Sequence, residues 1–90
     1  MGGMSSFVWH KVEQLSWPAD WASLFGRDAP IILEIGFGSG LFLVDLARRS
    51  SHANIVGLEI SIPSLRNAGR KVMRSGLANV CLLQADAWST

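Results

Sequence analysis

A short apolar run followed by three alternating glycines constrains this chain most: Ile31-Ile-Leu-Glu-Ile-Gly-Phe-Gly-Ser-Gly40. The apolar residues Ile31–Ile35 predict a short buried strand, and Leu41–Arg49 has the length and composition of a helix. Glycine takes positive φ without steric cost and lets a ligand approach the main chain closely, and a helix N-terminus offers unpaired N–H groups. A strand, a glycine turn and a helix in this order predict a site for a nucleotide-like ligand.

The spacing of the glycines bears on which ligand this site would take. The dinucleotide fingerprint G-x-G-x-x-G, counted from Gly36, needs a third glycine where Leu41 stands, and counted from Gly38 it needs one where Leu43 stands. The chain has instead a carboxylate, Glu34, two residues before the first glycine. A carboxylate does not favour a pyrophosphate, but it does favour the cationic amino group and sulfonium of S-adenosylmethionine. The turn therefore favours this cofactor, and an NAD enzyme is the least favoured reading.

Two further carboxylates follow later strands. Ile55–Ile60 predicts a second strand, and its Glu59 lies roughly 20 residues beyond the glycine turn, the spacing at which a strand end presents a carboxylate to ribose hydroxyls. A carboxylate can accept two hydrogen bonds from a vicinal diol, although a solvated acid at a strand end is the alternative. Asn79–Gln84 predicts a third strand, and Asp86 after it can accept from an exocyclic amine such as adenine N6. Because ligands bind at the carboxyl ends of parallel strands, we expect these groups to meet at one edge of the sheet.

The rest of the chain limits its class. At 90 residues, with 49% hydrophobic and 17% charged residues and a net charge of +1, it predicts one small globular domain. It has no apolar run long enough to cross a membrane and no secretory signal, and its single cysteine suits a reducing compartment, so we expect a cytoplasmic protein. His10 and His52 are expected in loops without ligand-spaced partners, so no metal site is predicted. Cys81 is expected to be buried and inert.

Two helices are expected outside the glycine motif. Residues 18–26 predict a short helix that ends at Gly26, and a longer helix is expected to begin after Ser61 and to run through Arg74. Its cations Arg66, Arg70 and Arg74 recur every four residues, which favours a solvated helix face over the alternative, an anionic partner such as RNA phosphate. The tryptophans at positions 9, 17 and 21 are expected to pack onto the domain in preference to stacking on bases.

Four segments carry a resemblance to a known family: Leu24-Phe-Gly-Arg-Asp-Ala-Pro30, Leu33-Glu-Ile-Gly-Phe-Gly-Ser-Gly40, Ile55-Val-Gly-Leu-Glu-Ile60 and Asn79-Val-Cys-Leu-Leu-Gln-Ala-Asp-Ala87. Over roughly residues 20–88 the chain strongly resembles the bacterial tRNA (guanine-N7-)-methyltransferase family. The resemblance implies a Rossmann-like class I methyltransferase fold, an α/β three-layer half with about three parallel strands. We expect an N-terminal arm at residues 1–19 and a half-domain that binds S-adenosylmethionine at residues 20–90.

The resemblance also implies the site and the activity. It assigns S-adenosylmethionine to Glu34, Gly36, Gly38, Gly40, Glu59, Asp86 and Ala87. The reaction would methylate N7 of a guanine in the variable loop of tRNA, and because N7 carries a free lone pair, no catalytic residue is predicted. The partner would be tRNA, bound through a C-terminal half. Charge and spacing, and not the resemblance, make Arg66, Arg70 and Arg74 the candidates for a further contact with tRNA. No metal or membrane partner is expected, and the oligomeric state is left open.

The sequence departs from the family at its C-terminal side. Family members continue into a fourth strand that ends in Pro-Asp-Pro-Trp, and the 90 residues do not contain this segment. We therefore expect an incomplete chain with little or no catalysis of its own. Two alternatives remain: a class I methyltransferase that acts on protein or on a small molecule, and a non-catalytic remnant that binds S-adenosylmethionine.

Overall fold

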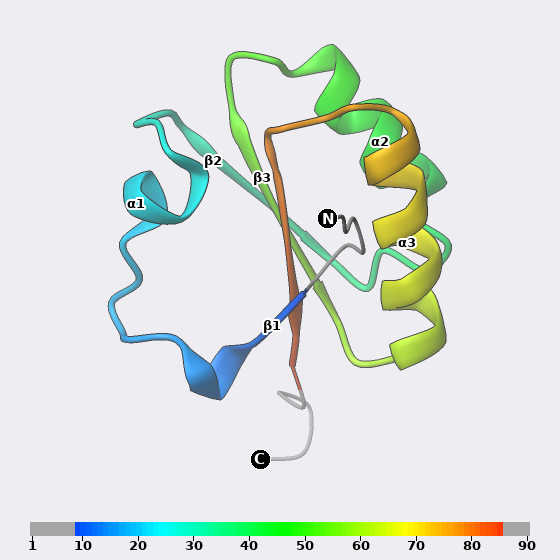
Figure 1. Cartoon of the computed structure of the whole chain (residues 1–90), viewed down its shortest axis with the longest axis horizontal. Helices are drawn as coiled ribbons and strands as arrows, with labels where there is room; N and C mark the ends of the chain where they lie inside the picture. Colours follow the sequence, from blue (N-terminus) through cyan, green and yellow to red (C-terminus); the bar gives the residue numbers. More distant parts are fainter. Residues whose placement is uncertain (1–8, 86–90) are drawn as a thin grey trace, which may run out of the picture.

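A computed structural model describes residues 9–85, in which four parallel strands form one sheet with helices on both faces (Figure 1). In chain order the elements are β1 (His10–Lys11), the 3-10 helix η1 (Val12–Gln14), α1 (Trp21–Phe25), β2 (Ile31–Ile35), α2 (Leu41–Arg49), β3 (Asn54–Glu59), α3 (Ile62–Arg74) and β4 (Val80–Gln84). The strand order is β1-β4-β3-β2, and every neighbouring pair is parallel. The α/β class and the three-layer arrangement are therefore confirmed.

The larger core lies between the sheet and the helices α2 and α3 (Figure 1). Alternate residues of β3 and β4 point toward this side, as the two-residue period of a strand requires. They pack with the apolar stripes of both helices, and the fully enclosed side chains are Leu43, Ala47, Ile55, Leu65, Ala68 and Leu82. Each large aliphatic side chain that is fully buried contributes about 1.5–3 kcal/mol to the stability of the fold, so this core fixes how α2 and α3 pack on the sheet.

A smaller core covers the opposite face and is built from the N-terminal residues. Val56, Cys81 and Leu83 of the sheet pack there against residues from η1, α1 and their connections: Val12, Leu15, Trp21 and Phe25. Trp21 also packs edge-on against Trp17, with ring centroids 5.9 Å apart. Packing of Trp9 and Trp21 onto the domain is confirmed, whereas Trp17 remains 54% exposed and is held by its Nε1–H, which donates to the Val12 carbonyl. Burial raises the pKa of the Cys81 thiol to about 11, which agrees with the expected inert cysteine.

The predicted boundaries agree closely with the structure around the glycine turn. The strand Ile31–Ile35 and the helix Leu41–Arg49 are found with the predicted ends. The second strand begins and ends one residue earlier than predicted, the third begins one residue later, and Ser61 caps α3 by accepting from the Ser64 N–H. The helix predicted at 18–26 is shorter, because Asp20 is its N-cap and Gly26 its C-cap.

Three expectations need correction. The sheet has a fourth strand, because β1 pairs with β4, and His10 therefore lies in a strand and not in a loop. The strand Ile31–Ile35 is not buried: Leu33 and Ile35 are 54% and 50% exposed. This strand is β2, at the edge of the sheet, and only the face that carries Ile32 is covered by the larger core.

No helix within residues 9–85 is long and apolar enough to cross a membrane.

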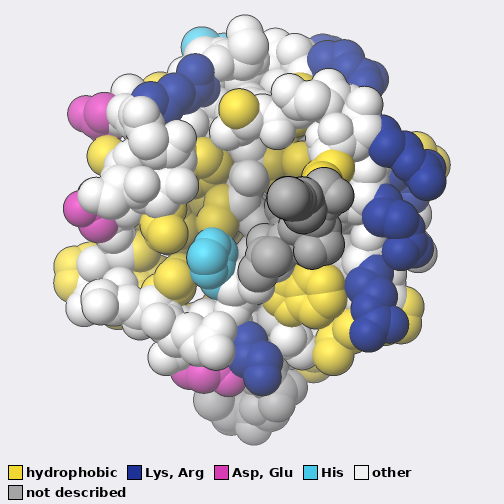
Figure 2. Space-filling view, viewed as in Figure 1, with side chains coloured by type: hydrophobic (Ala, Val, Ile, Leu, Met, Phe, Trp, Pro, Cys, Tyr) yellow, Lys and Arg dark blue, Asp and Glu magenta, His cyan; other side chains and the backbone are white. Residues whose placement is uncertain are grey.

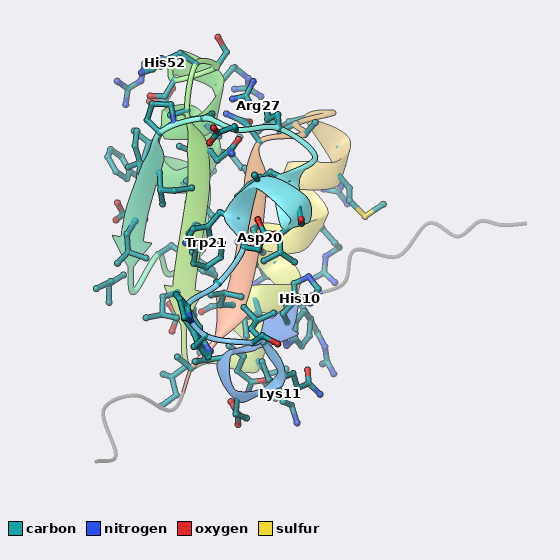
Figure 3. All side chains as sticks on the ribbon, turned by 90° about the vertical axis from the view of Figure 1, so that its left-hand side faces the viewer. His10, Lys11, Asp20, Trp21, Arg27 and His52 are labelled. Atoms are coloured by element: carbon teal, nitrogen blue, oxygen red, sulfur yellow. The ribbon has the colours of Figure 1, made fainter. Side chains whose placement is uncertain are left out.

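A polar network closes the amino ends of the strands, where Arg27 and His52 lie in Figure 3. The Arg27 guanidinium donates to Asn54 Oδ1 at 2.9 Å and to the carbonyls of Ser51 and Ala53. The amide of Asn79, which is 8% exposed, donates to three carbonyls near the end of α2. These bonds satisfy the backbone carbonyls of the turn between α2 and β3. The other end of the sheet, where the carboxyl ends of the strands lie, is the end at which parallel sheets bind ligands.

Candidate functional site

The glycine turn joins β2 to α2 at the end of the sheet where the carboxyl ends of the strands lie, which is called the carboxyl edge below. Its three glycines have φ values of +68°, +57° and +86° at Gly36, Gly38 and Gly40. The Gly36 N–H donates to the Leu58 carbonyl at 2.7 Å, which extends the sheet ladder by one bond, and the Gly40 N–H donates back to the Phe37 carbonyl at 3.1 Å. Left-handed backbone at alternate residues is the reason that this pattern requires glycine.

Two close contacts fix the turn on the core. The buried Phe37 ring lies over Gly57 of β3, where an added Cβ would come within 2.9 Å of the ring. Gly40, which is the N-cap of α2, lies against α3, where an added Cβ would be 2.6 Å from the Ala68 Cβ. The start of α2 is therefore held against α3, and its backbone cannot shift without disturbing both helices.

Glu59 ends β3 and is bonded directly to the glycine turn. Its Oε1 accepts from the Gly38 N–H at 3.0 Å, and its Oε2 accepts from the N–H groups of Ile60 and Ser61 at 3.0 and 3.1 Å. The side chain is 8% exposed. A carboxylate has about four acceptor positions, so three backbone bonds leave capacity for one further donor. The spacing in the sequence placed Glu59 at this edge, but it did not indicate that the carboxylate holds the turn.

Glu34 lies on β2 in register with Gly57 of β3. It shares the covered face of β2 with Ile32 and is half-buried, and no hydrogen bond joins its carboxylate to another residue within the described range 9–85. Glu34 is therefore a half-buried carboxylate next to the turn, and its oxygens are available to accept hydrogen bonds.

The turn is also held from α3, where Lys71 Nζ donates to the Ser39 carbonyl at 2.8 Å.

A pocket of about 280 Å³ lies farther along the same edge. It is lined by Lys11, Glu13, Ile60, Gln84 and Ala85, so it reaches from the end of β3 past the end of β4 to the N-terminal residues. The sequence indicated none of these five residues as part of a site. Asp86 and Ala87, which it did indicate, lie outside the described residues.

The structure thus brings Glu34, the three glycines and Glu59 to one edge of a parallel sheet, as predicted. Within residues 9–85, no three side chains of His, Cys, Asp or Glu gather in a way that could hold a metal ion. Strand β2, the glycine turn, helix α2 and strand β3 form a parallel β–α–β unit of the kind found in Rossmann-like α/β proteins.

Comparison with known proteins narrows this class. A family model described as "putative methyltransferase" matches residues 28–90, and the chain belongs to this family. It is similar to tRNA (guanine-N(7)-)-methyltransferases: it is 50% identical to that of Thermotoga maritima over 70 residues, or 78% of the chain, and 47% identical to that of Thermus thermophilus over 66 residues, or 73% of the chain. The relative from Geobacillus kaustophilus is 43% identical over 67 residues, or 74% of the chain. The resemblance found in the motifs is thereby confirmed.

The matched regions cover a minor part of each relative. They amount to 22%, 21% and 31% of the three proteins in the same order, so the chain spans between a fifth and a third of the length of the curated relatives that it matches.

Proposed function

We propose that this chain is the cofactor-binding part of an S-adenosylmethionine-dependent methyltransferase that modifies N7 of a guanine in tRNA. The observation that supports this most is the bond between Glu59 and the Gly38 N–H, because it makes the predicted ribose carboxylate and the glycine turn one continuous surface. The names of the relatives support the tRNA substrate. Because tRNA is processed in the cytoplasm of bacteria, we also propose a cytoplasmic location.

The residues present fit the cofactor. A Cβ built on Gly36 or Gly38 meets no described atom within 4 Å, so a ligand can approach the main chain there. The one remaining acceptor position of Glu59 suits a ribose hydroxyl, and the available Glu34 carboxylate suits the cationic amino-acid end. The cofactor would supply an activated methyl group, while this chain would bind and orient it. Guanine N7 has a lone pair and no proton, so none of the described residues needs to act as a base.

Cofactor binding is tested by titrating S-adenosylhomocysteine into the purified chain in a calorimeter. We expect saturable binding to one site, and we expect Glu34→Gln to weaken it by about tenfold, because an amide cannot make a charge-assisted bond to the amino-acid end. NAD serves as the control ligand and should not bind. Saturable binding of NAD without binding of S-adenosylhomocysteine would contradict the proposal. The tRNA step is tested separately, by fusing the C-terminal sequence of a relative to the chain and assaying guanine-N7 methylation, which the 90 residues by themselves should not perform.

The proposed contact with tRNA uses the exposed cations of α3. Figure 2 shows Lys and Arg side chains gathered in a stripe over this helix. Arg66, Arg70 and Arg74 are all exposed, and the one ion pair within residues 9–85 joins Arg49 to Asp45 and involves none of them. Arg70 donates to the Asn67 side-chain oxygen at 2.6 Å, but none of the three has an acidic partner within residues 9–85, so their guanidinium groups keep donors and charge with which to neutralise phosphates.

Charge neutralisation tests this interaction. Replacing Arg66, Arg70 and Arg74 together with Gln should weaken tRNA binding at low salt by about tenfold or more. It should also make binding less dependent on salt concentration, by about one unit of slope for each phosphate that is no longer neutralised. Arg49→Gln is the matched control, because this exposed arginine lies on α2 and not on α3, and it is paired with Asp45 of its own helix. Equal losses of tRNA affinity in the control and in the triple variant would show that the arginines of α3 do not form the contact with tRNA.

A further inference from the structure

We propose that the N-terminal residues Lys11 and Glu13 form one wall of the base-binding end of the cofactor site. This inference rests on the proposed function and adds to it a specificity-determining segment that lies outside the predicted half-domain. It follows from the pocket of about 280 Å³ that these two residues share with Ile60, Gln84 and Ala85.

The pocket continues the surface formed by the glycine turn and Glu59. Ile60 directly follows Glu59, and its N–H donates to the Glu59 carboxylate. Ala85 directly follows β4, and its N–H donates to the Glu59 carbonyl at 3.1 Å. A ligand whose ribose contacts Glu59 would therefore extend its base between Ile60 and Ala85, toward Lys11. In Figure 3 Lys11 lies at the end of the sheet toward which the strands run, opposite Arg27.

The N-terminal wall is built into the sheet. His10 and Lys11 of β1 pair with Leu83 and Gln84 of β4. The Trp9 indole N–H donates to the Gln84 side-chain oxygen at 3.3 Å, and the Lys11 N–H donates to the side-chain oxygen of Gln14. Behind these contacts, Val12 and Leu15 of the same segment pack onto the smaller core. The pocket wall is therefore held in place by main-chain pairing, by side-chain bonds and by apolar packing.

The chemistry of the lining suits a neutral heterocycle. Ile60, which is 42% exposed, provides apolar surface for a face of a base, and Ala85, which is 3% exposed, forms the closed side of the pocket. Lys11, Glu13 and Gln84 provide donors and acceptors for its edge. One cation and one anion give the rim no net charge, so it suits an uncharged base better than a phosphate group. Adenine, with one amino group and several ring acceptors, has this character.

Paired ligands test the assignment. Lys11→Met, Glu13→Gln and the double variant are titrated with S-adenosylhomocysteine and with 5′-methylthioadenosine, which keeps the base and ribose but lacks the amino-acid end. We expect the double variant to bind both ligands about fivefold more weakly, since both ligands carry the base that these side chains would bind. Glu34→Gln should weaken only S-adenosylhomocysteine. Asp28→Asn is the matched control, because this exposed acid lies next to Arg27 at the opposite edge.

The outcomes separate this inference from the proposed function. Lys11 and Glu13 are both exposed, Glu13→Gln keeps the size of its side chain and Lys11→Met shortens it by one atom, so the melting temperature should stay that of the unmodified chain. Unchanged affinity for both ligands in the double variant would overturn the role of the N-terminal wall and leave the cofactor site intact. Weaker binding of S-adenosylhomocysteine alone would also overturn it, because the base would then not be involved. If the unmodified chain bound neither ligand, the wall and the cofactor site would both be refuted.

Discussion

Replacing Gly40 with alanine should lower the free energy of unfolding by about 3 kcal/mol. Two costs add at this position. A residue with a Cβ loses about 1–2 kcal/mol in the left-handed region, and Gly40 has φ of +86°. The new Cβ would also lie 2.6 Å from the Ala68 Cβ and 2.8 Å from its Cα, and forcing α2 and α3 apart costs about 1–3 kcal/mol more. Urea denaturation followed by circular dichroism measures the change.

Gly76 provides the matched control for this prediction. It has φ of +65°, and a Cβ built on it meets no atom of residues 9–85 within 4 Å. Gly76→Ala should therefore show the conformational cost alone, about 1 kcal/mol. If the two variants were equally destabilised, the close approach of α2 to α3 at Gly40 would not contribute to stability, and the sharp start of α2 would follow from backbone geometry alone.

Glu59→Gln should weaken binding of S-adenosylhomocysteine by more than tenfold and lower the free energy of unfolding by about 2 kcal/mol. Both effects arise because the carboxylate accepts from three backbone N–H groups, those of Gly38, Ile60 and Ser61. An amide cannot accept at both ends of its fork, so its NH₂ group would face a backbone donor in a site that is 8% exposed. Calorimetric titration and urea denaturation measure the two changes on the same sample.

Glu34→Gln separates ligand binding from stability in this comparison. The Glu34 carboxylate is half-buried and has no hydrogen-bond partner within residues 9–85. The free energy of unfolding of the variant protein should therefore change by no more than about 0.5 kcal/mol, while its affinity for S-adenosylhomocysteine falls. A Glu59→Gln variant that lost stability but kept full affinity would make Glu59 a structural residue that only holds the turn.

Local signals in the sequence predicted the region from residue 31 to residue 74 well. The apolar run, the glycines at alternate positions and the cap at Ser61 are each decided by a few neighbouring residues, and the structure reproduces them. The exposure of Leu33 and Ile35 was not predictable in the same way, because apolar composition indicates a strand but not whether anything covers its second face.

The parts that the sequence did not indicate depend on contacts between distant residues. A strand of two residues such as β1 has no periodicity of its own and exists because β4 offers it a partner. The bond from the Gly38 N–H to Glu59 joins residues whose spacing suggests a ligand role and not a direct contact. The pocket beside Lys11 combines both cases, since its wall comes from a segment without a motif.

The pairing of β1 with β4 also bears on the order in which the molecule can assemble. Trp9 and Gln84, which hold this pair together, are 75 residues apart in the sequence. During synthesis the first strand leaves the ribosome long before its partner exists, while β2, α2 and β3 can already associate. Contacts between such distant residues form slowly. We therefore expect the wall beside Lys11 to be completed last, after the glycine turn and both long helices have reached their final positions.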